Sequence, residues 1–251
     1  MYRKIKSHIL LPKFILKNFV DDNGSLHCFN VAKNSYNLSR PSSFNTQEGR
    51  HSEDMENFLN AEIEAPLSST LAELKKILRG QKTSYRFYAD VFMKYLGALF
   101  ARSPELVDSV YENLVGFGLF TQQQLNDIIV GDAYNLAVND SDFENIYMQI
   151  MFNNSLREFV LPVSGVCVYG KAKIKTEAPH YVVILHPRIA VDIQAQATQT
   201  IMTVNSVDLL YVDLINQFSR LQCKGDLIAS NDYILNYVTG VGAELYNKTK
   251  S

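Results

Sequence analysis

The chain has 251 residues, of which 47% are hydrophobic and 20% are charged, a balance typical of a globular protein and not of a disordered one. A chain of this length buries roughly 70–75% of the surface that its unfolded form exposes, so it needs neither disulfides nor a metal ion to fold. The formal net charge of -2 excludes a global attraction to nucleic acids, and a role in binding them would require a local basic patch.

The amino-terminal stretch is the clearest candidate for such a patch. It carries five cations and no acidic residue up to position 17. These cations could bind a nucleic acid or a protein partner, but the simpler interpretation is a solvent-exposed face. The apolar run that follows Met1 to Lys6 is interrupted too early to be a secretory signal, and no run approaches 18 apolar residues, so we expect a cytoplasmic protein without a membrane span. The cations are Arg3, Lys4, Lys6, Lys13 and Lys17.

The first part of the chain, 1–47, is predicted to be rich in β-structure. The turn Asp21-Asp22-Asn23-Gly24 separates the apolar runs Ile9 to Phe19 and Leu26 to Val31, and an Asn-Gly pair in that setting predicts a hairpin. The stretch Asn34 to Gly49 is rich in Ser, Asn and Pro, which is typical of a loop.

From Ser52 the apolar spacing becomes helical. Ser52 is expected to cap a helix that Pro66 kinks or restarts, and a strongly apolar helix is predicted from Thr83 or Ser84 to about Arg102.

Three further helix starts are predicted from capping patterns, so that 52–155 is expected to be a helical block. One combines a cap with a proline at the first helical position, and the other two fit the capping box. They are Ser103-Pro104-Glu105, Thr121-Gln-Gln-Gln124 and Ser141-Asp-Phe-Glu144.

The region 156–193 is predicted to form strands, because Phe159 to Tyr169 and Tyr181 to Leu185 are rich in Val, Ile and Tyr. Pro187-Arg188 is expected to turn the chain into a further strand, Ile189 to Ile193.

The last region, 205–245, is predicted to hold a helix over 207–223 that is apolar on more than one face and therefore buried. Strands, helices, strands and a helix, in that order, are typical of an α+β fold. We therefore expect one domain, 1–251, with an amino-terminal hairpin, a central helical block, carboxy-terminal strands and a buried helix.

The usual metal and phosphate sites are not apparent. The histidines form no His-Xaa-Xaa-Xaa-His pair, and His180 and His186 would lie roughly 20 Å apart along one strand. Gly116-Phe-Gly118 and Gly240-Val-Gly242 lack the lysine and third glycine of a phosphate loop. We expect no metal and no cofactor. The three cysteines are widely spaced and are expected to be small buried hydrophobic residues: Cys28, Cys167 and Cys223.

Several short motifs, taken in order, resemble a family. Pro12-Lys-Phe-Ile-Leu-Lys-Asn-Phe19 precedes Asp22-Asn-Gly24, a glutamate-containing helix covers Glu56 to Glu64, and an apolar helix ends in Arg102-Ser103-Pro104. Later segments fit the same order, namely Ile184-Leu-His-Pro187-Arg188 and Val204-Asn205, the latter at the start of a helix. Over most of its length the chain is similar to a mostly bacterial, uncharacterised family, domain of unknown function four-two-three-eight.

Two positions depart from the pattern of that family. Its histidine stands three residues before the proline, where this chain has Ile9 and carries His8 one residue earlier. Its Ser-Asp-Xaa-Pro after the central strand is replaced by Leu161-Pro-Val-Ser164-Gly165, which has no aspartate.

Two functional hypotheses follow. The first is an uncharacterised cytoplasmic bacterial accessory protein, such as a phage-defence, toxin-like or mobile-element factor, that acts by binding a protein or nucleic acid; its support is the absence of a catalytic constellation from the sequence and the basic amino terminus. The alternative is a hydrolase, nuclease-like in character, in which the matched polar residues His8, Glu64, Arg102 and Asn205 converge. Convergence in one pocket would distinguish the two, because catalysis needs these groups within hydrogen-bond reach.

Arg102 has two possible roles at the corner between two helices. It either locks the corner by pairing with a carboxylate, with Glu62 or Glu64 as its partner, or points into a cleft and holds an anionic group.

Overall fold

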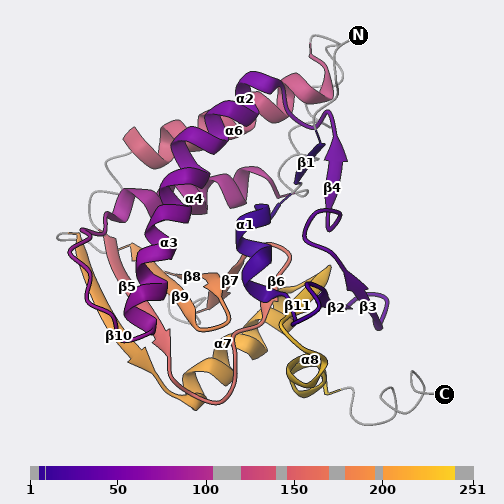
Figure 1. Cartoon of the computed structure of the whole chain (residues 1–251). Helices are drawn as coiled ribbons and strands as arrows, with labels where there is room; N and C mark the ends of the chain where they lie inside the picture. Colours follow the sequence, from indigo (N-terminus) through magenta and orange to yellow (C-terminus); the bar gives the residue numbers. More distant parts are fainter. Residues whose placement is uncertain are drawn as a thin grey trace.

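Paired strands form the framework of the fold, as the computed structural model in Figure 1 shows. It describes residues 6–8, 10–103, 120–139, 146–169, 179–195 and 200–240, without side chains at 6–8, 136–139 and 195. A five-stranded sheet has the order β10-β5-β9-β8-β7, in which only the β10–β5 pair is parallel. A four-stranded antiparallel sheet has the order β3-β2-β11-β6, and β1 pairs with β4. The strands are β1 Lys6–His8, β2 Leu26–Asn30, β3 Ser35–Ser39, β4 Thr46–Glu48, β5 Ile146–Asn153, β6 Leu161–Pro162, β7 Val166–Tyr169, β8 His180–His186, β9 Ile189–Ala195, β10 Ile201–Val207 and β11 Asp226–Ala229.

Helices lie on both faces of the five-stranded sheet. Phe100 of α4 contacts Tyr181 of β8, whereas residues of α7 contact Tyr169 of β7. Tyr181 pairs with Val168, the neighbour of Tyr169, so these two contacts are on opposite faces. In Figure 1 the sheet lies between α4 above and α7 below. The helices are α1 Lys13–Leu16, α2 Glu53–Leu59, α3 Ala65–Leu78, α4 Ala89–Ala101, α6 Gln122–Asn139, α7 Leu209–Gln222 and α8 Asp232–Thr239, with a 3-10 turn η1 at Lys17–Phe19 and a π-helical turn η2 at Asn60–Glu64.

The mixed α+β class is confirmed, with amino-terminal paired strands, central helices and carboxy-terminal strands. The predicted caps at Ser52 and Thr121 are present. The Ser52 hydroxyl accepts from the amide of Met55 at 3.2 Å. Thr121 and Gln124 exchange the two bonds of a capping box, at 3.2 and 2.9 Å. The helix starts predicted at Ser103-Pro104-Glu105 and Ser141-Asp-Phe-Glu144 fall largely outside the described residues.

Pro66 neither breaks the helix nor ends it, because the π-helical turn η2 precedes it. The amide of Ala65 donates to the carbonyl of Asn60, five residues back. Widening the turn accommodates the proline ring, which would otherwise crowd the carbonyl four residues earlier. Helix α3 then continues with Pro66 in its first turn.

The predicted Asn23-Gly24 turn closes a single antiparallel bridge, between Val20 and Leu26, and the longer amino-terminal hairpin forms one turn later. The segment before Asp21 is helical, at α1 and η1, and the Asn23-Gly24 turn leads from it into β2. The hairpin pairs β2 with β3, so the stretch 34–49 is not simply a loop but contains β3 and β4. All five residues of β3 are exposed or half-buried, and a polar composition is compatible with an edge strand.

Three other boundaries were predicted wrongly. Helix α4 starts at Ala89, and residues 81–88 before it have no regular secondary structure; there the Thr83 hydroxyl accepts from the amide of Tyr85, a local bond that competes with a helix. The predicted helical block 52–155 ends in a strand, β5. Asn205 lies inside strand β10, and the cap of the following helix is Asp208, which accepts from the amide of Tyr211 at 2.9 Å.

Helix α7 is packed on one side and is not buried all round. Its buried residues are Val212, Ile215, Asn216 and Ser219, while its opposite face is apolar and exposed. A helix apolar on two faces has the same periodicity whether the second face meets protein or solvent, which explains the error. The exposed leucines are Leu209, Leu210, Leu214 and Leu221.

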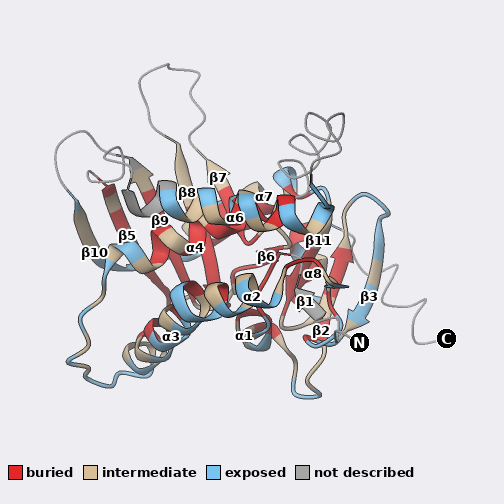
Figure 2. Cartoon of the chain, turned by 90° about the horizontal axis from the view of Figure 1, so that it is seen from above, coloured by how far each residue is buried: buried red, intermediate tan, exposed pale blue. Residues whose placement is uncertain are grey.

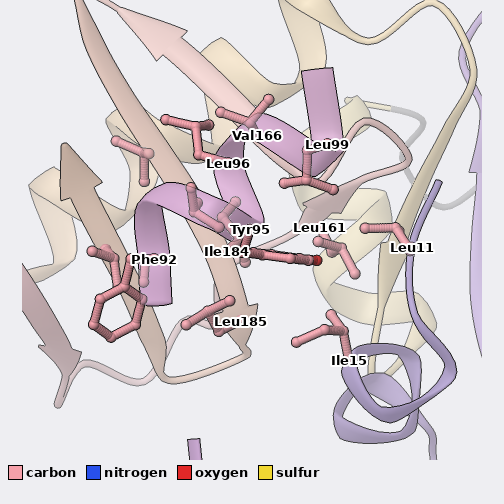
Figure 3. Packing of buried hydrophobic residues seen from close by; sticks show 14 of the residues in the cluster. Leu11, Ile15, Phe92, Tyr95, Leu96, Leu99, Leu161, Val166, Ile184 and Leu185 are labelled. Atoms are coloured by element: carbon pink, nitrogen blue, oxygen red, sulfur yellow. The ribbon is translucent and has the colours of Figure 1, made fainter. Parts of the chain in front are cut away.

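The main hydrophobic core lies where the amino-terminal segment, α4 and the five-stranded sheet meet. Leu11 and Ile15 gather there with Leu161 and with Tyr95 and Leu99 of α4 (Figure 3). Figure 2 shows the buried positions concentrated on the strands and on the inward faces of the helices. A second, smaller cluster packs α8 against the four-stranded sheet through Ile234, Leu235 and Val238.

We expect α7 to respond differently to truncation on its two faces. Ile215 is 0% exposed, so Ile215→Ala should cost about 2–5 kcal/mol of unfolding free energy. Leu214 is 44% exposed, and Leu214→Ala should cost less than about 1 kcal/mol. Urea denaturation followed by circular dichroism measures both, and equal losses would contradict this assignment of faces.

Candidate functional site

Two of the four predicted site residues are in contact. The guanidinium Nη2 of Arg102 lies 3.2 Å from the Glu64 carboxylate, which is the ion pair expected for a residue that locks the corner. Nη1 donates to the carbonyl of Leu10 at 3.4 Å, and the Arg102 carbonyl accepts from Arg50. The Arg102 residue is 4% exposed, so these contacts hold the amino-terminal segment, η2 and the end of α4 together.

The other two predicted residues do not join this pair. Asn205 is exposed on β10, which is one edge strand of the five-stranded sheet. Arg102 is near the opposite edge strand, β7, because its neighbours Phe100 and Ser103 line a cavity together with Val168 of β7. Four strand spacings separate those edges, about 19 Å. The His8 side chain lies outside the described residues. The structure therefore does not bring Asn205 to Glu64 and Arg102.

A different polar cluster, which we call the Asp192 network, lies on the α7 face of this sheet. The Asp192 carboxylate, on a residue that is 3% exposed, accepts from His180 Nδ1 at 3.0 and 3.1 Å. It also accepts from the hydroxyls of Tyr169 at 2.7 Å and Tyr211 at 3.4 Å. The rings of Tyr169 and His180 stack, with centroids 4.5 Å apart. A buried carboxylate is thus held by three donors, which offset the cost of its desolvation.

The electrostatics fix the proton positions in this network. Burial raises the pKa of Tyr169, and burial together with the charge of Asp192 raises the pKa of Tyr211. Both hydroxyls therefore stay protonated and can donate to Asp192. Because the carboxylate needs a donor at Nδ1, that nitrogen of His180 carries a proton, and in the neutral imidazole Nε2 is then the nitrogen with the lone pair.

A β-bulge creates the contact between His180 and Asp192. At the turn between β8 and β9, His186 pairs with Ile189. If that register continued along the hairpin, His180 would pair with Ala195, and the Asp192 side chain would lie on the face of the sheet opposite to His180. The register shifts by one residue between Ile184 and His186, so that Val182 pairs with Asp192 and His180 with Gln194. The bulge therefore puts the imidazole and the carboxylate on the same face.

The residues beside the network are polar and half-buried. Gln194 is the direct partner of His180, and Tyr147 and Gln149 of β5 stand opposite Gln194 and Asp192. Thr203 of β10 continues the row at Gln149. Gln194 is therefore the polar side chain next to His180 across the strand pair, and the row of polar residues continues from it toward the β10 edge.

His180 differs from the two other histidines that pair with aspartates in the described part of the chain. Both nitrogens of His27 are engaged, with Asp21 at 3.2 Å and the Tyr36 hydroxyl at 2.6 Å. His51 pairs with Asp127 at 3.0 Å, but its side chain is 1% exposed, and burial lowers its pKa. The His180 side chain is 26% exposed, and its Nε2 takes no part in the Asp192 network.

His186, the other histidine of the β8–β9 hairpin, has a structural role. Its Nδ1 accepts from the amide of Arg188 at 3.0 Å and so closes the turn. Burial, with nearby cations, lowers the pKa of His186 to about 4.

The remaining sequence-based expectations concern cations, cysteines and membranes. Lys13 and Lys17 are exposed, whereas the side chains of Arg3, Lys4 and Lys6 lie outside the described residues.

All three cysteines are free and buried, as predicted, and burial raises the pKa of each thiol. In the described part of the chain, no helix has the length and hydrophobicity to span a bilayer. The same residues contain no group of three or more acidic, His or Cys side chains placed to hold a metal ion.

Comparison with known proteins gives no relative: no family model, no curated protein and no solved structure matches the chain.

We expect Arg102→Lys to lower the free energy of unfolding by about 1–3 kcal/mol, because an ammonium cannot reach both the Leu10 carbonyl and Glu64 in the geometry of the fork. Arg86→Lys, at an exposed position, is the matched control and should change it by less than about 0.5 kcal/mol. Thermal and urea denaturation measure both. An unchanged melting temperature for Arg102→Lys would contradict the locking role.

Proposed function

We propose that the chain is a hydrolase in which His180 acts as the general base, and that it cleaves an ester or amide of a polar substrate. The observation that supports this most is the Asp192 network, in which a buried carboxylate fixes the tautomer of a partly exposed imidazole. The same pairing of an acid, an imidazole and an outward nitrogen activates water or a hydroxyl in acyl transfer.

The proposed reaction uses water as the nucleophile. His180 Nε2 removes a proton as the water oxygen attacks the carbonyl carbon, and Asp192 stabilises the imidazolium that forms. In this proposal the side-chain amide of Gln194, the cross-strand partner of His180, donates to the developing oxyanion. The imidazolium then returns its proton to the leaving group as the carbon–heteroatom bond breaks.

This proposal keeps the hydrolase class of the sequence-based alternative but relocates the site. Glu64 and Arg102 hold each other and a backbone carbonyl, and Asn205 is on a distant edge of the sheet. His180 and Asp192, in contrast, are in direct contact on neighbouring strands.

We expect the wild-type protein to hydrolyse at least one member of a panel of chromogenic p-nitrophenyl esters and p-nitroanilides. His180→Gln and Asp192→Asn should each lower kcat/KM by at least about 100-fold, since a positioned acid–base group contributes 10²–10⁴-fold. His27→Gln removes a histidine whose ring nitrogens are both engaged, and it should retain wild-type turnover.

Two controls separate catalysis from folding. Circular dichroism and thermal melting establish that each variant is folded, and ¹⁵N NMR reports whether His180 carries its proton on Nδ1 and loses that preference in Asp192→Asn. Equal turnover by wild type and folded His180→Gln, or no turnover across the panel, would count against the hydrolase.

A second proposal, supported by a separate observation, is that the chain acts by binding a protein through α7. Leu210 and Leu221 are each 77% exposed and eleven positions apart in sequence, and Leu214 lies between them on the same outward face of the helix. An uncharged row of large exposed side chains is typical of a protein interface.

We expect a protein partner to copurify with the wild-type protein and to be lost from the double variant Leu210→Glu/Leu221→Glu. The recovery of that partner should fall by at least about 10-fold, because buried interface anchors contribute about 2 kcal/mol or more. Leu38→Glu, at an exposed leucine on β3, is the matched control and should retain the partner. Quantitative mass spectrometry of the copurified proteins measures all three, and identical recoveries would contradict binding through this face.

A further inference from the structure

Basic side chains gather where the end of α3 meets the turn between β8 and β9. Lys75 lies in the last turn of α3, and Arg79 ends the helix four residues later, so both lie on one face of it. The Lys75 ammonium donates to the side-chain oxygen of Asn18 at 2.8 Å, and the Asn18 amide nitrogen donates to the carbonyl of Leu185 at 3.2 Å. Asn18 therefore holds Lys75 beside the end of β8, where His186 follows Leu185.

His186 adds a hydrogen-bond donor to this corner. Its Nδ1 accepts from the amide of Arg188 at 3.0 Å, so the proton of the neutral ring is on Nε2. The ring is neutral near neutral pH, because burial and the charges of Lys75, Arg188 and Arg79 lower its pKa to about 4. In the described part of the chain the bond from Arg188 is the one side-chain hydrogen bond of His186, so the Nε2 proton has no acceptor there.

The acids in the described part of the chain do not neutralise these cations. Lys75 is half-buried and bonds to a neutral amide. Burial lowers the pKa of Lys75, the charge of Arg79 lowers it further, and no described carboxylate acts in the opposite direction. The neighbouring Lys76, in contrast, pairs with Glu73 at 2.6 Å. Like charges are thus held together in a partly desolvated corner, and an anion between them would relieve their repulsion.

Capping of α3 does not explain the two cations. The amide of Gly80 donates to the carbonyl of Ile77 at 2.8 Å, and the amide of Gln81 donates to the carbonyl of Lys76 at 2.9 Å. Gly80 has a φ of +74°, the left-handed conformation that commonly ends a helix. Backbone amides therefore satisfy the last carbonyls of α3 without a lysine or arginine side chain.

We propose that this corner binds the phosphate group of a small phosphate monoester, with Lys75, Arg79 and His186 as its donors. The two cations provide charge-assisted hydrogen bonds, and His186 Nε2 provides a neutral one. A site made only of donors selects an anion whose oxygens all accept, as those of a phosphate dianion do. The donors meet at one corner and do not follow a groove, and the net charge of -2 gives no general attraction to a polyanion.

The corner is separate from the proposed hydrolase site. His186 is six residues along β8 from His180, a distance of about 20 Å in a strand. The two proposals therefore stand or fall independently.

Isothermal titration calorimetry with inorganic phosphate and with phenyl phosphate, at about pH 8 where a monoester is a dianion, tests this proposal. The wild-type protein should bind phenyl phosphate saturably at one site. Lys75→Gln and Arg79→Gln should each weaken that binding by at least about 10-fold, because each removes a charge-assisted hydrogen bond. Lys76→Gln removes the neighbouring cation, which already pairs with Glu73, and should change the affinity by less than about two-fold.

Thermal melting provides a readout that also shows whether each variant is folded. Phenyl phosphate should raise the melting temperature of the wild-type protein, because a ligand that binds only the folded state stabilises it, and chloride at the same ionic strength should not. Arg79→Gln, at an exposed position, should keep the ligand-free melting temperature and lose the rise that phenyl phosphate causes. In ¹⁵N NMR of the wild-type protein, bound phosphate should shift the Nε2 resonance of His186.

Four results would overturn the proposal. They are no saturable binding of either probe, equal affinities of wild type and Arg79→Gln, equal losses in Lys76→Gln and Arg79→Gln, and tighter binding of a single-stranded oligonucleotide without a terminal phosphate than of phenyl phosphate. His180→Gln should bind phenyl phosphate as the wild type does, so loss of ester hydrolysis in that variant bears on the hydrolase alone.

Discussion

The arrangement of the described elements depends on a close approach at Gly165, where the chain passes from the four-stranded sheet to the five-stranded sheet. β6 and β7 are only three residues apart, and the amide of Gly165 donates to the carbonyl of Pro162 at 2.8 Å to make the turn. At φ +75° a side chain would be strained, and a Cβ would stand 2.9 Å from both Leu11 and Leu99. The amino-terminal segment and α4 are thereby packed directly against the crossing point.

Packing at that point accounts for the position of Arg102 one turn further along α4. Once Leu99 is held against Gly165, the guanidinium is directed to the carbonyl of Leu10 and to Glu64. Buried ion pairs are weak sources of net stability, but removing one partner leaves an uncompensated charge. The pair therefore specifies how the amino-terminal segment docks more than it stabilises the fold.

Patterns carried by neighbours in sequence could be predicted, whereas contacts made across strands could not. The Ser52 cap and the Thr121–Gln124 capping box depend on residues three apart, and both were found from sequence. The Glu64–Arg102 pair was found because a family resemblance and a helix end pointed to the same corner. His180 and Asp192 were missed, because a hairpin register counted from Pro187-Arg188 places them on opposite faces and only the bulge reverses this. The face of α7 was also missed, since apolar spacing alone does not say which of two apolar sides meets solvent.

The Gln222 side chain has a consequence for how copies of this chain can meet. Its amide occupies backbone groups of Val168 on the outer side of β7, as a neighbouring strand would, and so closes one edge of the five-stranded sheet. The opposite edge, β10, carries exposed Val204, Asn205 and Ser206. A sheet with one closed edge can be extended by a single pairing at the other, giving a closed two-fold pair, but it cannot add strands head to tail. One glutamine would therefore block repeated edge-to-edge growth of the five-stranded sheet at β7.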